Sequence, residues 1–315
     1  MDLPKELEGG AYNIPQICIT LAALAYDSNT ELISELANKS LATQANWSLA
    51  WGPVDNGSNR VYVVKNGLTN EYVVAIRGTV KSVESMFIDA DSFYLAPLPW
   101  NMGENMISDG MSDAWTHINN MVDSKTGQNL YQFISHFASN TTVYVTGHSQ
   151  GGCLASVVAL WLAQTFNHIK VYPITFAAET AGNKAFATVY QTAFLFGGLR
   201  VFNPNDIVPM GFADIDKIKH LYGSEPPYVA CPDEFKAIIN GLESTLPEYV
   251  QVIRAYPLPN AFIVKVRGEV HFFNRTQVFF KQVEIQHSCF SYLHLLNAPM
   301  TNGAPKVWPP VYINA

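Results

Sequence analysis

The chain has 315 residues, of which 48% are hydrophobic and 14% charged, so it can bury a large core and lacks the composition of a disordered segment. A formal net charge of -7 and the lack of a basic tract argue against nucleic acid as a partner. No apolar stretch reaches the roughly 18 residues of a membrane-spanning helix. The start of the chain does not resemble a secretory signal. We therefore expect a soluble protein without a transmembrane segment, either cytoplasmic or secreted by another route or after signal removal.

Short β-like runs alternate with stretches of helical periodicity, which is typical of a mostly parallel sheet flanked by helices. Apolar residues at helical spacing predict helices over residues 14–24, about 111–137 and 154–162. Strands are expected, in chain order, over residues 60–65, 72–76, 143–145, 171–176, 199–202, 262–266, 270–273 and 278–283. Residues 211–256 are helical and irregular, and we interpret them as an inserted, cap-like segment of a single domain that spans residues 1–315.

The most specific motif is glycine-x-serine-x-glycine over residues 147–151, between a short buried strand and a helix. A serine nucleophile on a strained strand-to-helix turn needs small neighbours, because chain and substrate must approach it closely. Ser149 is therefore the predicted nucleophile.

A serine hydroxyl becomes nucleophilic only when it can pass its proton to an imidazole that a carboxylate orients. With a nucleophile in this strand-turn-helix setting, the acid follows the serine along the chain and the histidine follows the acid. Asp206 lies in the turn just after the expected strand over residues 199–202, which favours it over Asp214 and Asp216.

Four histidines follow Asp206, namely His220, His271, His287 and His294. His287 is the first choice, because it stands at the break between the last β-like run and a helical pattern, where a loop can reach back over the sheet. His294 is the second choice. His148, beside the nucleophile, is expected to pack beneath the turn.

A tetrahedral oxyanion needs preorganised hydrogen-bond donors. The backbone amide of Gln150 is one donor, because it follows the nucleophile at the turn. Thr79 lies in the loop that follows the apolar strand-like run over residues 72–76, and it could donate from both its amide and its hydroxyl. The predicted oxyanion hole therefore combines Thr79 and Gln150.

Four motifs in this order resemble the class 3 lipase family, the fungal-type triacylglycerol lipases. They are Arg77-Gly78-Thr79, the run from Gly147 to Gly152, Asn203-x-x-Asp206-Ile207-Val208-Pro209, and His287 in a short C-terminal segment. The resemblance extends from about residue 14 to 297. It implies an α/β-hydrolase fold with Ser149, Asp206 and His287 as the triad. It also implies a short helical lid over residues 82–89, with the apolar side chains Val83, Met86, Phe87 and Ile88.

These observations predict a serine carboxylester hydrolase, free of metal and cofactor, that cleaves lipid esters through an acyl-enzyme intermediate. The expected activity is that of a triacylglycerol lipase acting at an oil-water or membrane surface. A phospholipase A1, exported as a toxin, is the alternative, and a non-catalytic signalling module is disfavoured because all three triad residues are present. The 81 positions between Asp206 and His287 leave room for residues 211–256 to form an added cap.

Overall fold

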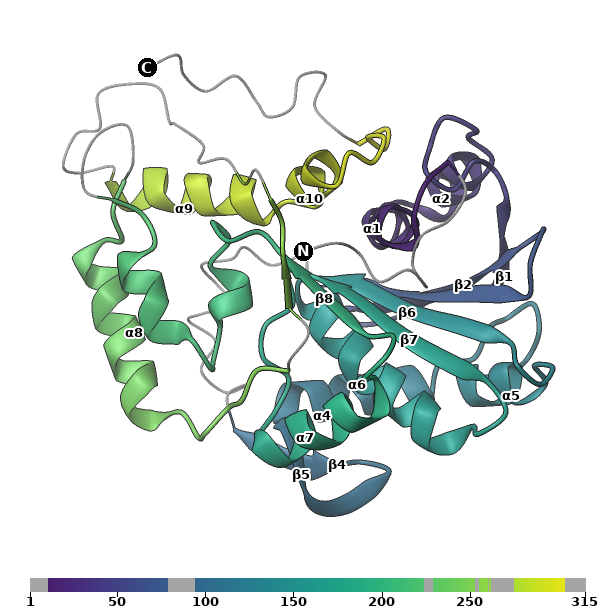
Figure 1. The fold of residues 1–315 in the computed structure, drawn as a ribbon, viewed down its shortest axis with the longest axis horizontal. Helices are drawn as coiled ribbons and strands as arrows, with labels where there is room; N and C mark the ends of the chain where they lie inside the picture. Colours follow the sequence, from purple (N-terminus) through teal and green to yellow (C-terminus); the bar gives the residue numbers. More distant parts are fainter. Residues whose placement is uncertain are drawn as a thin grey trace.

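The computed structural model describes residues 11–78, 94–223, 229–252, 255–259, 261 and 275–303 (Figure 1). Thr79, the expected lid over residues 82–89 and the expected strands over residues 262–266 and 270–273 lie outside the described residues.

The described part of the chain forms a seven-stranded sheet, a two-stranded sheet and helices around them. The strands are β1 (Trp47–Asn56), β2 (Asn59–Asn66), β3 (Glu71–Ile76), β4 (Leu95–Leu98), β5 (Asn101–Ser108), β6 (Thr142–His148), β7 (Lys170–Phe176), β8 (Leu199–Phe202) and β9 (Ala255–Pro257). The α-helices are α1 (Ile14–Leu24), α2 (Asn29–Leu36), α4 (Asp109–Asn119), α5 (Leu130–Ser135), α6 (Gln150–Thr165), α7 (Lys184–Ala193), α8 (Asp233–Thr245), α9 (Arg275–His287) and α10 (Cys289–Leu295), and the 3-10 helices are η3 (Val208–Met210) and η4 (Ile215–His220).

The large sheet has the strand order β1-β2-β3-β6-β7-β8-β9. The first three strands pair antiparallel, and every pair from β3 to β9 is parallel, so the expected mostly parallel sheet of an α/β-hydrolase is confirmed. Ile76 at the end of β3 pairs with Gly147 in β6, which in turn pairs with Thr175 in β7. The carboxyl ends of these three strands therefore meet at one edge of the sheet.

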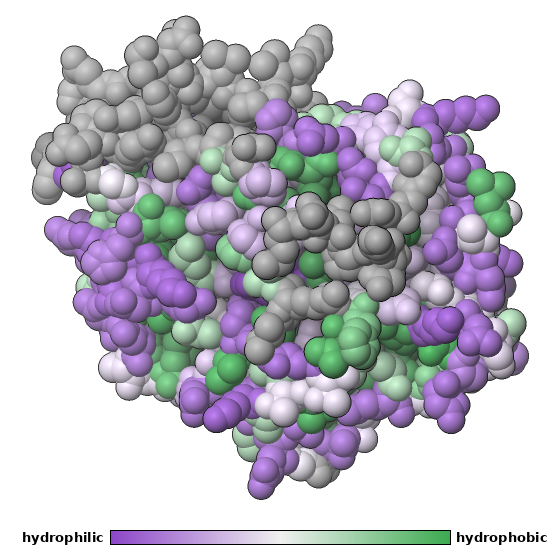
Figure 2. All heavy atoms as spheres, viewed as in Figure 1, coloured by the Kyte–Doolittle hydropathy of each residue, from purple (hydrophilic) through white to green (hydrophobic). Residues whose placement is uncertain are grey.

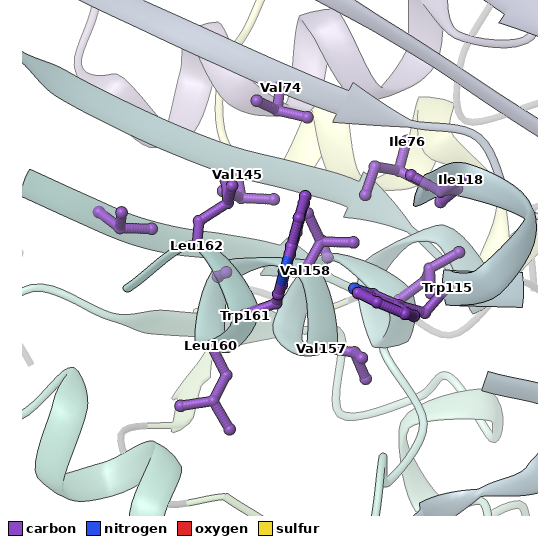
Figure 3. Close-up of a cluster of buried hydrophobic side chains, with 14 of the residues drawn as sticks. Val74, Ile76, Trp115, Ile118, Val145, Val157, Val158, Leu160, Trp161 and Leu162 are labelled. Carbon is purple, nitrogen blue, oxygen red and sulfur yellow. The ribbon is translucent and has the colours of Figure 1, made fainter. Parts of the chain in front are cut away.

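Helices cover both faces of this sheet, with α1 and α10 on one side and α4, α6 and α7 on the other (Figure 1). Side chains of a strand alternate between the faces, so Val61 and Val63 of β2 join the cluster under α6, while Tyr62 and Val64 join the cluster under α1. Figure 3 shows the first of these clusters, in which Trp161 of α6 lies next to Val145 of the sheet, with Trp115 of α4 to one side. No helix among the described residues is both long and apolar enough to cross a membrane.

A third apolar cluster joins η4, α8 and α9 beside the sheet. Phe235 of α8 lies between Phe279 and Phe280 of α9, with ring centroids 5.8 and 5.0 Å away. Only one side of α8 is buried, and hydrophilic residues dominate the left side of Figure 2, where this helix lies. α8 and η4 therefore support the helix that ends in His287.

Two sequence-based assignments of secondary structure are wrong. The expected strand over residues 278–283 is part of α9, because Phe279, Phe280 and Val283 are spaced so that all three reach the third cluster from one helix. The expected long helix over residues 111–137 is instead two helices, α4 and α5. A turn separates them, in which Asp123 accepts hydrogen bonds from two following amides and Gly127 has a positive φ of 66°.

Candidate active site

Ser149 stands between the end of β6 and the first residue of α6, in a strained conformation with φ 62° and ψ -136°. Glycines make this turn sterically feasible. A Cβ on Gly147 would collide with the carbonyl group of Gly151, and a Cβ on Gly151 would collide with the carbonyl oxygen of Ile76. The amide of Ser149 donates to the carbonyl oxygen of Phe176 in β7, at 3.0 Å, which fixes the turn to the neighbouring strand. The predicted nucleophile therefore lies on a rigid elbow at the carboxyl edge of the sheet.

The structure brings the three predicted triad residues into one chain of hydrogen bonds. Nε2 of His287 lies 2.8 Å from Oγ of Ser149, and its Nδ1 lies 2.9 Å from Oδ2 of Asp206. All three residues are buried, although Ser149 and His287 are separated by 138 positions and Asp206 and His287 by 81. Because a carboxylate only accepts hydrogen bonds, Nδ1 of His287 donates to Asp206 and Nε2 faces the serine as the acceptor.

Two further groups hold the carboxyl group of Asp206. The amide of Val208 donates to Oδ1 at 3.0 Å, and the hydroxyl of Tyr292 donates to Oδ2 at 2.8 Å. Asp206 is fully buried, so these donors offset the loss of water around its carboxyl group. Sequence analysis did not find Tyr292, although it lies only five positions after His287, on α10.

A second set of hydrogen bonds ties the Asp206 loop to the end of α9. Nδ2 of Asn203 donates to the side-chain oxygen of Gln286 at 2.7 Å and to its carbonyl oxygen at 3.1 Å. The amide of Asn203 donates to the hydroxyl oxygen of Tyr292 at 3.1 Å. Since Gln286 precedes His287, these bonds fix the histidine relative to the acid. Asn203 was known from the sequence only as part of the motif that contains Asp206, and Gln286 was missed, because the two residues lie 83 positions apart.

His148 lies against His287, with ring centroids 4.7 Å apart and the rings tilted by 40°. Burial, and next the neighbouring His287, hold the pKa of His148 well below its ordinary value, so its imidazole is neutral. His148 therefore supports His287 from below the turn. The alternative histidine, His294, is exposed on α10.

The two alternative acids have other ionic partners. Asp214 pairs with Lys217 at 2.7 Å, and Asp216 pairs with Lys219. Of the three aspartates considered from the sequence, Asp206 is the one whose carboxyl group contacts His287 in the described structure.

The predicted oxyanion hole is described in part. Gln150 is the first residue of α6, so its amide has no acceptor within the helix and lies at the positive end of the helix dipole. Gly78, which leads into Thr79, lies against the elbow, because a Cβ on Gly78 would come within 2.5 Å of the carbonyl oxygen of His148. Gly78, the last described residue before Thr79, therefore lies directly beside the elbow. Among the described residues, no cluster of histidine, cysteine and carboxylate side chains could hold a metal ion.

Known structures share this architecture. M37 lipase is 24% identical to this chain with a TM-score of 0.76, and the match covers 91% of this chain and 94% of that one. Lip2 lipase from Yarrowia lipolytica is 21% identical with a TM-score of 0.52, over 64% of this chain and 74% of that one. At these identities the two structures establish the α/β-hydrolase fold.

The fold and the family match together define a serine hydrolase of the lipase and esterase type. Residues 73–214, which include the elbow and Asp206, match the family described as lipase (class 3). This part of the chain is thus similar to the class 3 lipase family.

Proposed function

We propose that the protein is a triacylglycerol lipase with Ser149, Asp206 and His287 as its catalytic triad. The observation that carries this proposal is the buried chain of hydrogen bonds from Oγ of Ser149 through His287 to Asp206, at an elbow where the serine is held in a strained conformation. The family match supports a lipid ester as the substrate.

Each residue has a role that follows from its position. Nε2 of His287 takes the proton from Ser149 as Oγ attacks the ester carbonyl, and Asp206 stabilises the imidazolium that forms. The amide of Gln150, with Thr79 as the second donor proposed from the sequence, binds the oxyanion. His287 then passes its proton to the departing alcohol, and the same groups activate a water molecule that hydrolyses the acyl-enzyme.

Triacylglycerol is favoured over phospholipid by the charge of the chain. A net charge of -7 opposes association with anionic membranes, whereas an emulsion of neutral triacylglycerol presents no such repulsion.

The substrate class can be tested by measuring initial rates on emulsified tributyrin, on phosphatidylcholine vesicles and on soluble p-nitrophenyl butyrate. Wild type is expected to hydrolyse tributyrin fastest per mole of enzyme. Faster release of the sn-1 acyl chain from phosphatidylcholine would make the protein a phospholipase A1, and hydrolysis of the soluble ester alone would make it an esterase.

The triad can be tested on the same substrates with two serine variants. Ser149→Ala should lose several orders of magnitude in rate, because the variant lacks the nucleophile. Ser156→Ala is the matched control, since Ser156 is buried in the same helix and its hydroxyl donates to the carbonyl oxygen of Gly152. Near-normal turnover by Ser149→Ala would refute the proposed mechanism.

A further inference from the structure

Glu179 is a buried carboxylic acid at the carboxyl edge of the sheet, three residues after the end of β7. The residue is 8% exposed, and its Oε2 is fully buried without a hydrogen-bond partner. A buried carboxyl oxygen without a donor is unfavourable, because it has lost water and gained nothing in exchange. Such a group in a folded protein therefore calls for an explanation.

The backbone around Glu179 is fixed between the elbow and the Asp206 loop. On one side, a Cβ on Gly152 would lie 3.1 Å from Cβ of Ala178, the residue before Glu179. On the other side, a Cβ on Gly211 would lie 3.3 Å from Cβ of Glu179 itself. Nη2 of Arg200 donates to the carbonyl oxygen of Ala178 at 3.3 Å. The position of Glu179 is thus set by the segments that carry the nucleophile and the acid.

The charged groups of the catalytic centre affect the pKa of the Glu179 carboxyl group. Burial raises its pKa to about 7, a hydrogen bond from its own backbone amide and the charges of His287 and Arg200 oppose this rise, and Asp206 adds to it. Burial raises the pKa of Tyr26, which follows α1, and of Cys153 in α6, and the charge of Glu179 adds to both shifts. The titratable and charged groups around Glu179 are therefore the His287 and Asp206 pair, Arg200, Tyr26 and Cys153.

No ion pair explains Glu179 as a purely structural residue. Arg200 is the nearby cation, yet its Nη2 donates to the carbonyl oxygens of Ala178 and Pro209, and its Nε has no partner. Among the described residues, Glu179 forms no salt bridge with Arg200 or any other cation. Its charge is therefore available to act on the other groups within its reach.

We propose that Glu179 is a positioning residue for the proposed triad, a second negative charge that stabilises the imidazolium of His287 through space while Asp206 binds it directly. The inference rests on the proposed function, in which His287 becomes positively charged in the transition state. Between buried groups a unit charge is weakly screened, and one within roughly 10 Å is sufficient to change a rate about tenfold. Glu179 can act only when it is ionised.

The expected signature is a difference between wild type and Glu179→Gln that depends on pH. On p-nitrophenyl butyrate, the two proteins should have similar kcat/KM at pH 5.5, where Glu179 is protonated. At pH 8.5 the variant should be about tenfold slower, with the loss in kcat and little change in KM, because the charge acts on the transition state. A ratio that stays constant from pH 5.5 to 8.5 would show that Glu179 has a structural role only.

Glu35→Gln is the matched control for this experiment. Glu35 is also a buried glutamate with carboxyl oxygens that lack a hydrogen-bond partner, but it lies on α2, and neither His287 nor Asp206 acts on its pKa. Its ratio to wild type should not change with pH over the same range. A change as large as that of Glu179→Gln would mean that any buried glutamate produces the effect, and would overturn the inference.

A second measurement covers the case in which Glu179→Gln does not fold. The rate at which a serine-directed phosphonate inactivates wild type should show two ionisations between pH 5 and 9, one of them from Glu179 with a pKa of about 7. A single ionisation would overturn the inference. If the proposed function is wrong, the result is different: Ser149→Ala remains active or the phosphonate labels another residue, whatever the effect of Glu179→Gln.

Discussion

Replacement of Glu179 by glutamine is expected to stabilise the folded protein, by an amount that grows as the pH rises. In the folded state the pKa of Glu179 is about 7, raised by burial, compared with an ordinary value of 4.5. Below pH 4.5 the acid is protonated in both states and contributes nothing to the pH dependence. Between pH 4.5 and 7 the unfolded chain releases the proton while the folded protein retains it, so wild type loses stability as the pH rises.

The size of this effect follows from the two pKa values. At about 1.4 kcal/mol for each pH unit, the interval from 4.5 to about 7 corresponds to about 3 kcal/mol in the free energy of unfolding. Glutamine has nearly the same shape and no charge to bury, so Glu179→Gln avoids this cost. The difference between the variant and wild type should be smallest at pH 4.5 and should reach about 3 kcal/mol at pH 8.

Urea unfolding followed by tryptophan fluorescence at pH 4.5, 6 and 8 measures this difference directly. The midpoint of the variant should move above that of wild type as the pH rises, with an unchanged slope. A difference in unfolding free energy that is the same at all three pH values would refute the argument, because it would mean that Glu179 is ionised or protonated alike in the folded and unfolded states. A gain in stability together with a loss of rate at pH 8 would show that the buried charge costs stability and aids catalysis.

Three further substitutions test the geometry of the site. His287→Ala should be as severe as Ser149→Ala while His294→Ala stays active, and the reverse result in a p-nitrophenyl butyrate assay would contradict the triad assignment. Tyr292→Phe removes a donor to Asp206 and should lower kcat about tenfold and the free energy of unfolding by about 1 kcal/mol. Tyr62→Phe, which loses a buried hydrogen bond to Leu21, should lower only stability. Equal kcat in both variants would show that Tyr292 does not support the acid. Gly151→Ala should lower the melting temperature and the rate of ester hydrolysis, because the added Cβ has no room beside Ile76. Gly103→Ala, with open space around the added Cβ, should behave like wild type. A fully active Gly151→Ala would refute the steric account of the elbow.

Sequence reasoning succeeded where one local pattern determines the structure. The apolar runs predicted β3, β6 and β7, because they are short and rich in valine and isoleucine, as is typical of strands buried on both faces. The strand predicted over residues 278–283 failed because a short apolar run fits either a strand or a helix, and packing against α8 selects the helix. β1 was not predicted, and its pairing with β2 contains two register shifts that interrupt the alternation on which strand prediction depends.

The same distinction holds for the candidate site. The elbow is local, so glycines close in sequence indicated Ser149, and the order of acid and histidine left few choices for Asp206 and His287. Tyr292 gave no signal, because its contact with Asp206 joins residues 86 positions apart. Glu179 gave none either, because a carboxylate after a strand usually lies in a solvated turn and its burial depends on segments distant in sequence. Thr79 and the lid remain predictions from sequence.

The packing of α10 on α1 has a consequence for how the enzyme acquires activity during folding. Nε2 of Gln16 in α1 donates to the carbonyl oxygen of Leu296, just after α10, across 280 positions. Ser149 depends on β6, β7 and α6, which are close in sequence, whereas His287 stays in place only when α9 and α10 are docked. Closing so long a loop is entropically unfavourable, so this contact is expected to form after the central sheet. The reactivity of Ser149 during refolding should therefore report the docking of α10 on α1, and it should appear later than the fluorescence change that accompanies formation of the sheet.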